Sequence, residues 1–316
     1  MYSLKRIITA IPTLIAISIV IFLILALAPG DPLSEFAANP AITSEVRENI
    51  RQSLGLDQPI PVRYVKWFSA FLQGDMGYSF TSRSPVFELL KQRLPATLWV
   101  VGLAYLLSTF IAIPLGVIAA IAKNTWRDRL IMLVAFLGFS LPTFFTGLVF
   151  IIIFSVKLNW FPSIYKSTLQ VKGFSGLIEQ IKQSVMPILV LTLYQSAILI
   201  KYVRSAIVEE LNQEYVKTAY AKGLSKFATL RRHIMRNAMI PVVTLVALDI
   251  PAIFTGALVT EQVFRVPGIG SLLIESIYRS DTPVIMAITF IYAILIVIFN
   301  LIADLIYGVV DPRIEY

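Results

Sequence analysis

The chain has 316 residues, of which 57% are hydrophobic and 15% charged, with a mean hydropathy of +0.78 and a net charge of +8. Soluble domains are about 45–50% apolar and about 25% charged, so this composition excludes an ordinary soluble enzyme and indicates a membrane protein. The excess of Lys and Arg is then expected at the cytoplasmic face of the membrane rather than at a nucleic-acid site. The lack of cysteine excludes disulfides and thiolate metal sites, and a single histidine excludes a multi-histidine metal site.

Six apolar runs are each close to the ~20 residues that an α-helix needs to cross a bilayer. They predict an all-α polytopic membrane protein with six transmembrane helices, at residues 7–28, 98–122, 130–156, 185–207, 238–259 and 284–308. The first run follows two basic residues, as a secretory signal does, but it exceeds the usual apolar core of about 7–15 residues and lacks a small-residue cleavage site. We therefore expect an uncleaved anchor. Prolines predict kinks within five of the spans: Pro12, Pro114, Pro142, Pro187 and Pro251.

Positive charge predicts the orientation of these spans. Residues 123–129 carry three cations and one anion, and residues 201–236 carry eight cations and three anions. Basic loops lie on the cytoplasmic side, so we expect both segments and both termini in the cytoplasm. Residues 157–184 would then lie outside, yet they carry four lysines and one glutamate, so they are an exception to this charge rule.

Residues 29–96 hold seven cations and seven anions and are too polar to cross lipid. Apolar residues at helical spacing predict three short helices there, at about residues 44–54, 62–73 and 85–93, the first two ending at Gly55 and Gly74. We expect an extracytoplasmic helical insertion whose apolar stripes pack internally. The predicted organisation is then an anchor helix plus insertion over 1–96, a core transmembrane domain over 97–308, and a cytoplasmic tail over 309–316.

The connection at residues 208–237, between the fourth and fifth spans, is much longer than the about 2–8 residues that usually join two helices. Residues 214–222 contain neither glycine nor proline, which predicts a surface helix that ends at Gly223. Val216, Ala219 and Tyr220 share one face of it, which suits the groove of a partner protein. A solvated basic loop is the alternative.

Here the sequence resembles a known family. YVKTAYAKGLS at residues 215–225 and HIMRNAMIP at 233–241 are similar to the coupling loop of ABC-importer permeases of the dipeptide/oligopeptide (peptide/nickel) transport family. Lys217-Thr-Ala219 stands where the wider superfamily has Glu-Ala-Ala, and this departure is typical of the peptide branch. Further segments resemble the B-type inner-membrane subunit in the same order, at residues 29–32, 54–59, 74–77, 93–97, 140–143, 255–261, 263–270 and 311–313.

The resemblance implies the type I ABC importer permease fold, a location in a bacterial or archaeal plasma (inner) membrane, and ATP-driven import of dipeptides or oligopeptides. The implied partners are a second homologous permease in a heterodimer, two ABC ATPase subunits, an extracytoplasmic binding protein and the peptide substrate. Because the chain lacks the phosphate-binding motif G-x-x-x-x-G-K-[ST], we expect it to be no enzyme and to bind no cofactor itself, with ATP and Mg on the ATPases. The residues expected to couple to them are Glu214, Tyr215, Lys217, Ala219, Lys222 and Gly223.

Two further groups are candidate sites. Asp249 lies about ten residues, or ~15 Å, into the fifth span, where a carboxylate is costly unless it faces a cavity or a cation. With Gln195 beside it, Asp249 is a candidate to bind peptide amino groups, and a structural contact, for example with Lys201, is the alternative. At the outer mouth, four residues form either a gate or a tight turn: Glu261, Pro267, Gly268 and Gly270.

Three alternatives stay open at this point. The same importer class handles nickel complexes or glutathione. An ion-gradient-driven secondary transporter would also use kinked helices and a buried Asp, although it does not need a thirty-residue docking loop. A membrane enzyme would need a nucleophile with a base or a metal cluster, and neither the single His233 nor any H-E-x-x-H motif supplies one.

Overall fold

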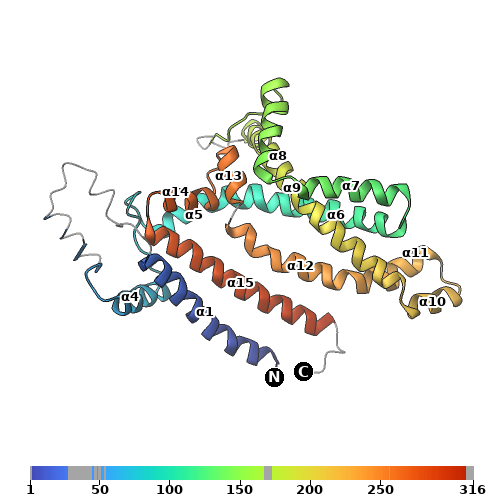
Figure 1. The fold of residues 1–316 in the computed structure, drawn as a ribbon, viewed down its shortest axis with the longest axis horizontal. Helices are drawn as coiled ribbons and strands as arrows, with labels where there is room; N and C mark the ends of the chain where they lie inside the picture. The colour runs from blue at the N-terminus through green and yellow to red at the C-terminus, as the bar shows by residue number, and fades with distance from the viewer. Residues whose placement is uncertain are drawn as a thin grey trace.

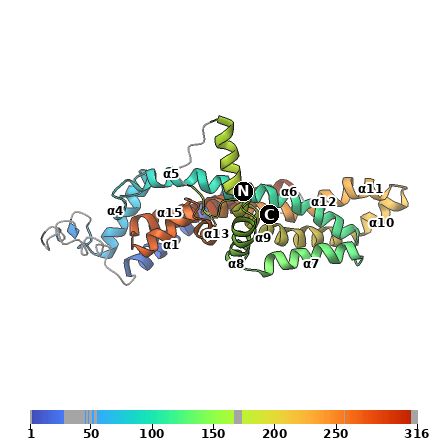
Figure 2. The ribbon, with the colours of Figure 1, turned by 90° about the horizontal axis from the view of Figure 1, so that it is seen from above.

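The computed structural model describes residues 2–27, 55–166, 173–255 and 257–310, together with residues 45, 48, 51 and 52. The described elements are helices, which confirms the all-α polytopic prediction. Of the helix predicted at about residues 44–54, the described residues 45, 48, 51 and 52 are helical. Residues 309–310 of the predicted tail are also helical, whereas the motif at 29–32 and residues 311–316 lie outside the described residues. Figure 1 shows a broad, elongated bundle, and Figure 2 shows that α10 and α11 lie at one end of its long axis and α4 at the other.

Five helical segments are long and apolar enough to cross a membrane, which confirms five of the six predicted spans. Two of them are the single helices α1 (Tyr2–Leu27) and α15 (Thr282–Val310). A third is α9 (Gly173–Leu211). The other two are composite: α5 (Val86–Thr97) continues through η1 (Leu98–Gly102) into α6 (Leu103–Ile121), and α11 (Lys226–Thr229) continues through η3 (Leu230–Ile234) into α12 (Met235–Thr255).

The predicted boundaries of three spans are too short. The segments Val86–Ile121, Gly173–Leu211 and Lys226–Phe254 have 36, 39 and 29 residues. At 1.5 Å per residue, the longest two measure about 54–58 Å and exceed the ~30 Å hydrocarbon core. In each segment the helix begins with polar turns that precede the apolar run. Hydropathy alone does not detect these turns.

The third predicted span, residues 130–156, is wrong as one continuous helix. Helix α7 (Trp126–Ser140) and the pair α8 (Thr143–Phe150) and η2 (Ile151–Lys157) meet at 98°. Leu141 has an extended backbone, with φ −89° and ψ 128°, because the residue before a proline is disfavoured in a helix. Pro142 thus causes a full break rather than a kink. Each half is about 22 Å long, too short to cross the core alone.

The fifth span also ends earlier than predicted. Helix α12 stops at Thr255, and a separate short helix α13 (Leu258–Phe264) follows, so residues 258–259 do not belong to the span. A tight turn then leads to α14 (Ile269–Tyr278). Both short helices therefore lie in the connection between the last two spans.

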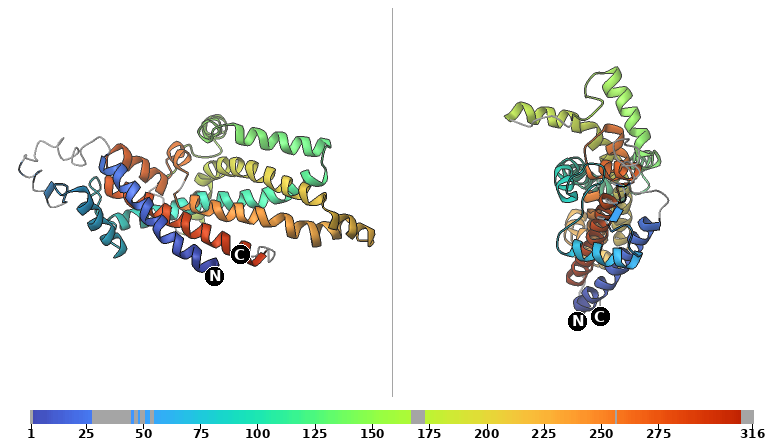
Figure 3. Two further views of the ribbon diagram at one scale, coloured as in Figure 1. Left: turned by 60° about the horizontal axis from the view of Figure 1, so that its bottom comes forward. Right: turned by 90° about the vertical axis from the view of Figure 1, so that its left-hand side faces the viewer.

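The bundle is built on close contacts between α6, α7 and α9, which Figure 3 shows alongside one another. A Cβ atom on Gly116 of α6 would lie 2.6 Å from the side chain of Val203, and one on Gly138 of α7 would lie 3.1 Å from that of Ala197. Small residues at these places let the backbones approach closely, as in other membrane helix pairs. On the other side, α12 packs on α15, and α15 packs on α1.

The polar insertion is attached to the start of α15. Asp281, with 2% of its surface exposed, accepts hydrogen bonds from Ser79 Oγ at 2.5 Å and from the backbone N–H groups of Phe80 and Thr81 at 3.1 and 3.2 Å. Three donors satisfy a carboxylate that would be costly to bury alone. This contact holds residues 79–81 against the last span.

Candidate functional site

The predicted surface helix in the basic connection is present as α10 (Glu214–Ala221). Figure 1 shows it projecting with α11 beyond the end of the bundle. Gln213 has an extended backbone before the helix, and Glu214 lies in the first turn, where a negative charge favours the helix dipole. Gly223 has φ +80°, a left-handed conformation that glycine adopts at no steric cost, so it ends the helix as predicted.

One face of α10, the inner face, packs on the chain itself. Val216 and Ala219 are 1% and 6% exposed, and Val216 belongs to a buried cluster with Ile207 of α9 and Ile234 of η3. The expectation that Ala219 allows close approach of a partner is therefore corrected. Its three-residue spacing from Val216 places both side chains on the same inward side.

Tyr215 also holds α10 to its own chain. Its hydroxyl donates a hydrogen bond to the carboxylate of Glu210 at the end of α9, and its ring packs against the same buried cluster. Burial and this hydrogen bond raise the pKa of Tyr215 to about 12, so the hydroxyl stays protonated and remains a donor at neutral pH. Tyr215 thus joins the two helices.

The opposite side, the outer face of α10, is exposed. It comprises Glu214, Lys217, Thr218 and Ala221. Lys217 Nζ lies 2.7 Å from Glu214 Oε1, but these side chains are 68% and 85% exposed, so the pair adds little stability. Ala221 is the small residue at the centre of this face. Beside it, Lys222 and Gly223 are exposed, and a Cβ on Gly223 would have nothing within 4 Å.

A salt bridge beside this loop was missed from the sequence. Arg204 of α9 donates from Nε and Nη2 to the two oxygens of Asp128 at 2.6 and 2.7 Å, and the backbone N–H of Asn124 donates to the same carboxylate at 2.9 Å. Asp128 is 3% exposed. The only sequence signal was that Asp128 is the single acidic residue in a basic turn, and its charge was taken only as part of the net charge of that turn.

The structure brings together the two residues predicted for the pathway. Gln195 of α9 donates from Nε2 to Asp249 Oδ2 of α12 at 2.9 Å. Both residues line a narrow cavity with Tyr105 of α6, and Tyr105 and Gln195 also line a larger neighbouring cavity of about 270 Å³. Among the described residues, Asp249 forms no salt bridge with Lys201, which is exposed and lines a separate cavity. Lys201 is therefore not the structural partner of Asp249, whose hydrogen bond to Gln195 is the contact that the structure shows.

Three of the four residues predicted at the outer mouth meet around a buried carboxylate. Glu261 is 0% exposed and accepts hydrogen bonds from Thr97 Oγ1 at 3.0 Å and from the Ser271 N–H at 2.9 Å. A Cβ on Gly268 would lie 2.4 Å from this carboxylate, and one on Gly270 would lie 2.9 Å from its Oε2 atom. The two glycines leave the space that the carboxylate fills. Together with Thr97 and Ser271, these residues are called the Glu261 cluster.

The Glu261 cluster links three elements. Thr97 Oγ1 also accepts a hydrogen bond from the Ile269 N–H at 2.8 Å, so α5, α13 and α14 meet at one point. Burial raises the pKa of Glu261, and the hydrogen bonds from Ser271 and Thr97 oppose that rise. Pro267 lies half-buried in the turn between α13 and α14. The role of Thr97 was not predicted, because the sequence around a helical threonine does not indicate which residue its hydroxyl will bond.

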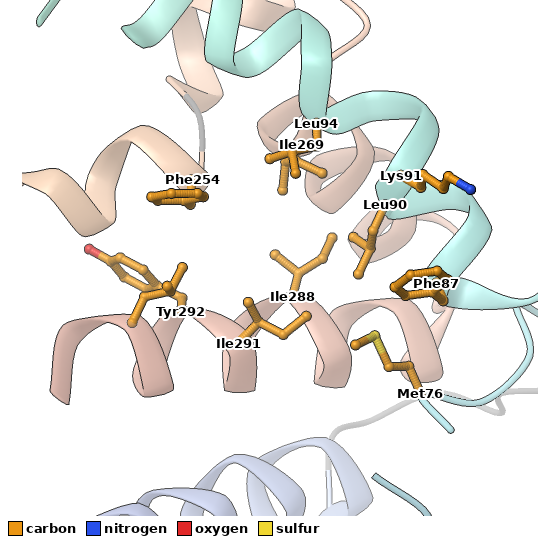
Figure 4. Close-up of a pocket in the computed structure, with 11 residues that line it drawn as sticks. Met76, Phe87, Leu90, Lys91, Leu94, Phe254, Ile269, Ile288, Ile291 and Tyr292 are labelled. Carbon is orange, nitrogen blue, oxygen red and sulfur yellow. The ribbon is translucent and has the colours of Figure 1, made fainter. Parts of the chain in front are cut away.

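A second cavity of about 270 Å³ lies between α5, α12, α14 and α15 and has mostly apolar walls. Figure 4 shows Phe254 and Tyr292 at one end of it and Met76 and Phe87 at the other, with the ammonium group of Lys91 pointing away. Sequence patterns did not predict it, because its walls come from segments far apart in the chain. In the described part of the chain, no three His, Asp or Glu residues are placed to hold a metal ion.

Comparisons with known proteins place the chain in a family. A family model described as the binding-protein-dependent transport system inner membrane component matches residues 112–316, and a model for the N-terminal part of such components matches residues 1–101. The chain is 40% identical over 316 residues to an oligopeptide transport system permease protein of Bacillus subtilis, covering 100% of this chain and 99% of that protein.

It is also 36% identical over 315 residues to a glutathione transport system permease protein of Salmonella paratyphi A, covering 100% of this chain and 99% of that protein. The two family models together cover the described spans and α10 except residues 102–111, which lie within the second span. These matches confirm the resemblance to ABC-importer permeases found in the sequence. The chain belongs to the family of inner membrane components of binding-protein-dependent transport systems.

Proposed function

We propose that this chain forms half of the translocation pore of an ATP-driven peptide importer. An extracytoplasmic binding protein delivers the peptide, and two ABC ATPase subunits supply the energy. The relatives support a peptide substrate, because one is named for oligopeptides and the other for glutathione, which is a tripeptide. Nickel complexes remain the second candidate cargo. Family membership favours this mechanism over an ion-gradient-driven carrier.

The observation that carries the proposal is the two-sided helix α10. Its inner face belongs to a buried cluster with residues of α6, α7, α9 and α12, whereas its outer face is exposed. A force on the outer face is therefore transmitted to several spans at once, because packed cores move as rigid units. Closure of the ATPases on ATP would then tip these spans between inward-open and outward-open states.

Within the membrane, the pair of Asp249 and Gln195 is the proposed contact for the peptide. Gln195 donates to one carboxylate oxygen of Asp249 and also lines the neighbouring cavity of about 270 Å³, where we propose that the peptide lies. At the outer mouth, the Glu261 cluster is the proposed gate region. The second permease of the heterodimer would cover apolar side chains that this chain leaves exposed on its spans, such as Phe110 and Phe136.

The proposed orientation has the α10 end of the bundle and both termini in the cytoplasm. The excess of Lys and Arg in residues 201–236 supports it. Figure 1 also shows the start of α1 and the end of α15 on one side of the bundle. The insertion and the Glu261 cluster would then face outward, towards the binding protein.

Gly223 offers the most direct test of coupling. Gly223→Trp places a large side chain at the end of α10, where this chain has no atoms to clash with it. Gly223→Asn is the matched control, because asparagine also adopts the left-handed conformation. We expect both variants at normal levels in the membrane, and only the Trp variant to lose substrate-stimulated ATP hydrolysis in the assembled complex. Normal hydrolysis by the Trp variant would refute docking at this face.

A further inference from the structure

Helix α4 (Ile60–Leu72) presents three distinct sides. Its ring face packs on two spans: Trp67 lies against Phe22 of α1 and Phe290 of α15, with ring centroids 5.7 and 5.5 Å apart. Phe71 stands edge-on to Phe290 at 4.9 Å, and Tyr64 edge-on to Phe22 at 5.5 Å. Such ring pairs stabilise a contact beyond the effect of their buried area, so α4 is attached to both spans.

The positions of these contacts set the depth of α4. Phe22 lies five residues before the end of α1, and Phe290 lies eight residues after the start of α15, which is about 8 and 12 Å along each helix. The apolar part of α1, Thr9–Leu27, has 19 residues and measures about 28 Å, close to the ~30 Å hydrocarbon core. The ring face of α4 therefore lies beside the apolar length of the spans, at the end remote from α10.

The two remaining sides of α4 have opposite character. Val65 and Leu72, seven residues and thus two turns apart, form an apolar flank and are 63% and 70% exposed. Lys66 and the C-cap residue Gln73, also seven residues apart, form a polar flank with Arg63, and Val62 is the exposed apolar side chain on this flank. The ring face lies between the two flanks, so the helix is apolar on one side and cationic on the other.

We propose that α4 is an interfacial membrane helix that binds phospholipid. The apolar flank lies on acyl chains, and Arg63 and Lys66 of the polar flank lie at the headgroup phosphates. The depth argues for lipid as the occupant rather than a water-borne protein, because a docking protein would have to enter the hydrocarbon to reach Val65. A helix with one cationic and one apolar side is the usual form of such interfacial helices. The inference does not depend on the substrate or on which side of the membrane α4 faces.

Cysteine substitution tests the proposal, since the chain has no cysteine of its own. Four variants are compared in open membrane fragments of cells expressing the full complex: Val65→Cys and Leu72→Cys on the apolar flank, Lys66→Cys and Gln73→Cys on the polar flank. A charged maleimide reacts only with hydrated thiolate. We expect the apolar-flank variants to react at least about tenfold more slowly than their neighbours, after normalisation to the rate in denaturant. Equal rates at all four positions would overturn the proposal.

A second measurement identifies what protects the apolar flank. The same variants carry an uncharged bimane fluorophore, and the complex is reconstituted with phospholipids brominated in their acyl chains. We expect strong quenching at positions 65 and 72 and weaker quenching at 66 and 73. Protection from maleimide without quenching would show that a protein covers the flank. Protection that appears only when the binding protein is added would assign the flank to that protein. Either result would contradict the lipid assignment.

Discussion

Arg204 of α9 donates two hydrogen bonds, at 2.6 and 2.7 Å, to the carboxylate of Asp128 near the start of α7. Two parallel bonds between a guanidinium and a carboxylate give the strongest and most directional kind of ion pair. Asp128 also accepts the N–H of Asn124, so the short turn between α6 and α7 is held in the same contact. The spans that we propose to move with α10 are thus joined at the end nearest to it.

Loss of this salt bridge should destabilise the bundle more than loss of a surface pair. Arg204→Ala leaves the Asp128 carboxylate buried without its cation, which costs about 3 kcal/mol. We expect a clear fall in the thermal midpoint of the detergent-solubilised complex. Lys217→Ala, which breaks the exposed pair with Glu214, is the control and should leave the midpoint unchanged. Equal midpoints for the two variants would contradict the structural role of Asp128.

The two faces of α10 predict opposite effects for two nearby substitutions. Ala221→Trp enlarges the outer face and should abolish substrate-stimulated ATP hydrolysis while the thermal midpoint stays normal. Ala219→Trp overfills the buried inner face, which costs about 1–3 kcal/mol, so this variant should be unstable. The measurements are the thermal midpoint and the rate of ATP hydrolysis of each purified complex. An active Ala221→Trp complex would show that the outer face is not the docking surface.

Asp249→Asn tests the proposed peptide contact with little structural change. The asparagine carbonyl can still accept the hydrogen bond from Gln195, but the negative charge is lost. We expect normal assembly with a large loss of peptide uptake. Lys201→Gln, on the exposed side of α9, is the control and should transport normally. If Asp249→Asn transports at the wild-type rate, the carboxylate has no essential role in the pathway.

Gly268 and Glu261 should show strong energetic coupling. A Cβ at position 268 would lie 2.4 Å from the Glu261 carboxylate, so Gly268→Ala must displace it and disturb its bonds to Thr97 and Ser271. Gly268→Ala alone should lower the thermal midpoint. In the Glu261→Ala background, where that space is empty, the same change should cost much less. Additive losses in this double-mutant cycle would contradict the packing of the cluster.

Apolar length was sufficient to predict five of the six spans, because a helix in lipid must satisfy its own backbone and the lipid selects for apolar side chains. The break at Pro142 was not predictable from length, since residues on both sides of it are equally apolar. Periodicity placed Val216 and Ala219 on one face of α10, but it could not tell which face is buried. That depends on the neighbouring α9 and η3, which come from other parts of the chain.

Polar residues could be predicted as candidate site residues where they interrupt an apolar span, because a polar side chain is energetically costly in lipid. Asp249 and Gln195 were paired from the sequence because both interrupt apolar spans, and they meet at 2.9 Å. The roles of Thr97 and Arg204 were not predicted, since each depends on a hydrogen-bond partner that lies 164 or 76 positions away in the chain.

The central claim is that this chain transports peptide with energy from ATPases docked at α10. The most direct test is uptake of a labelled oligopeptide into proteoliposomes that contain the purified complex, with ATP on the α10 side and the binding protein on the other. We expect uptake to require both ATP and the binding protein and to continue when ion gradients are collapsed. Uptake that proceeds without ATP and stops when an ion gradient is removed would contradict this claim.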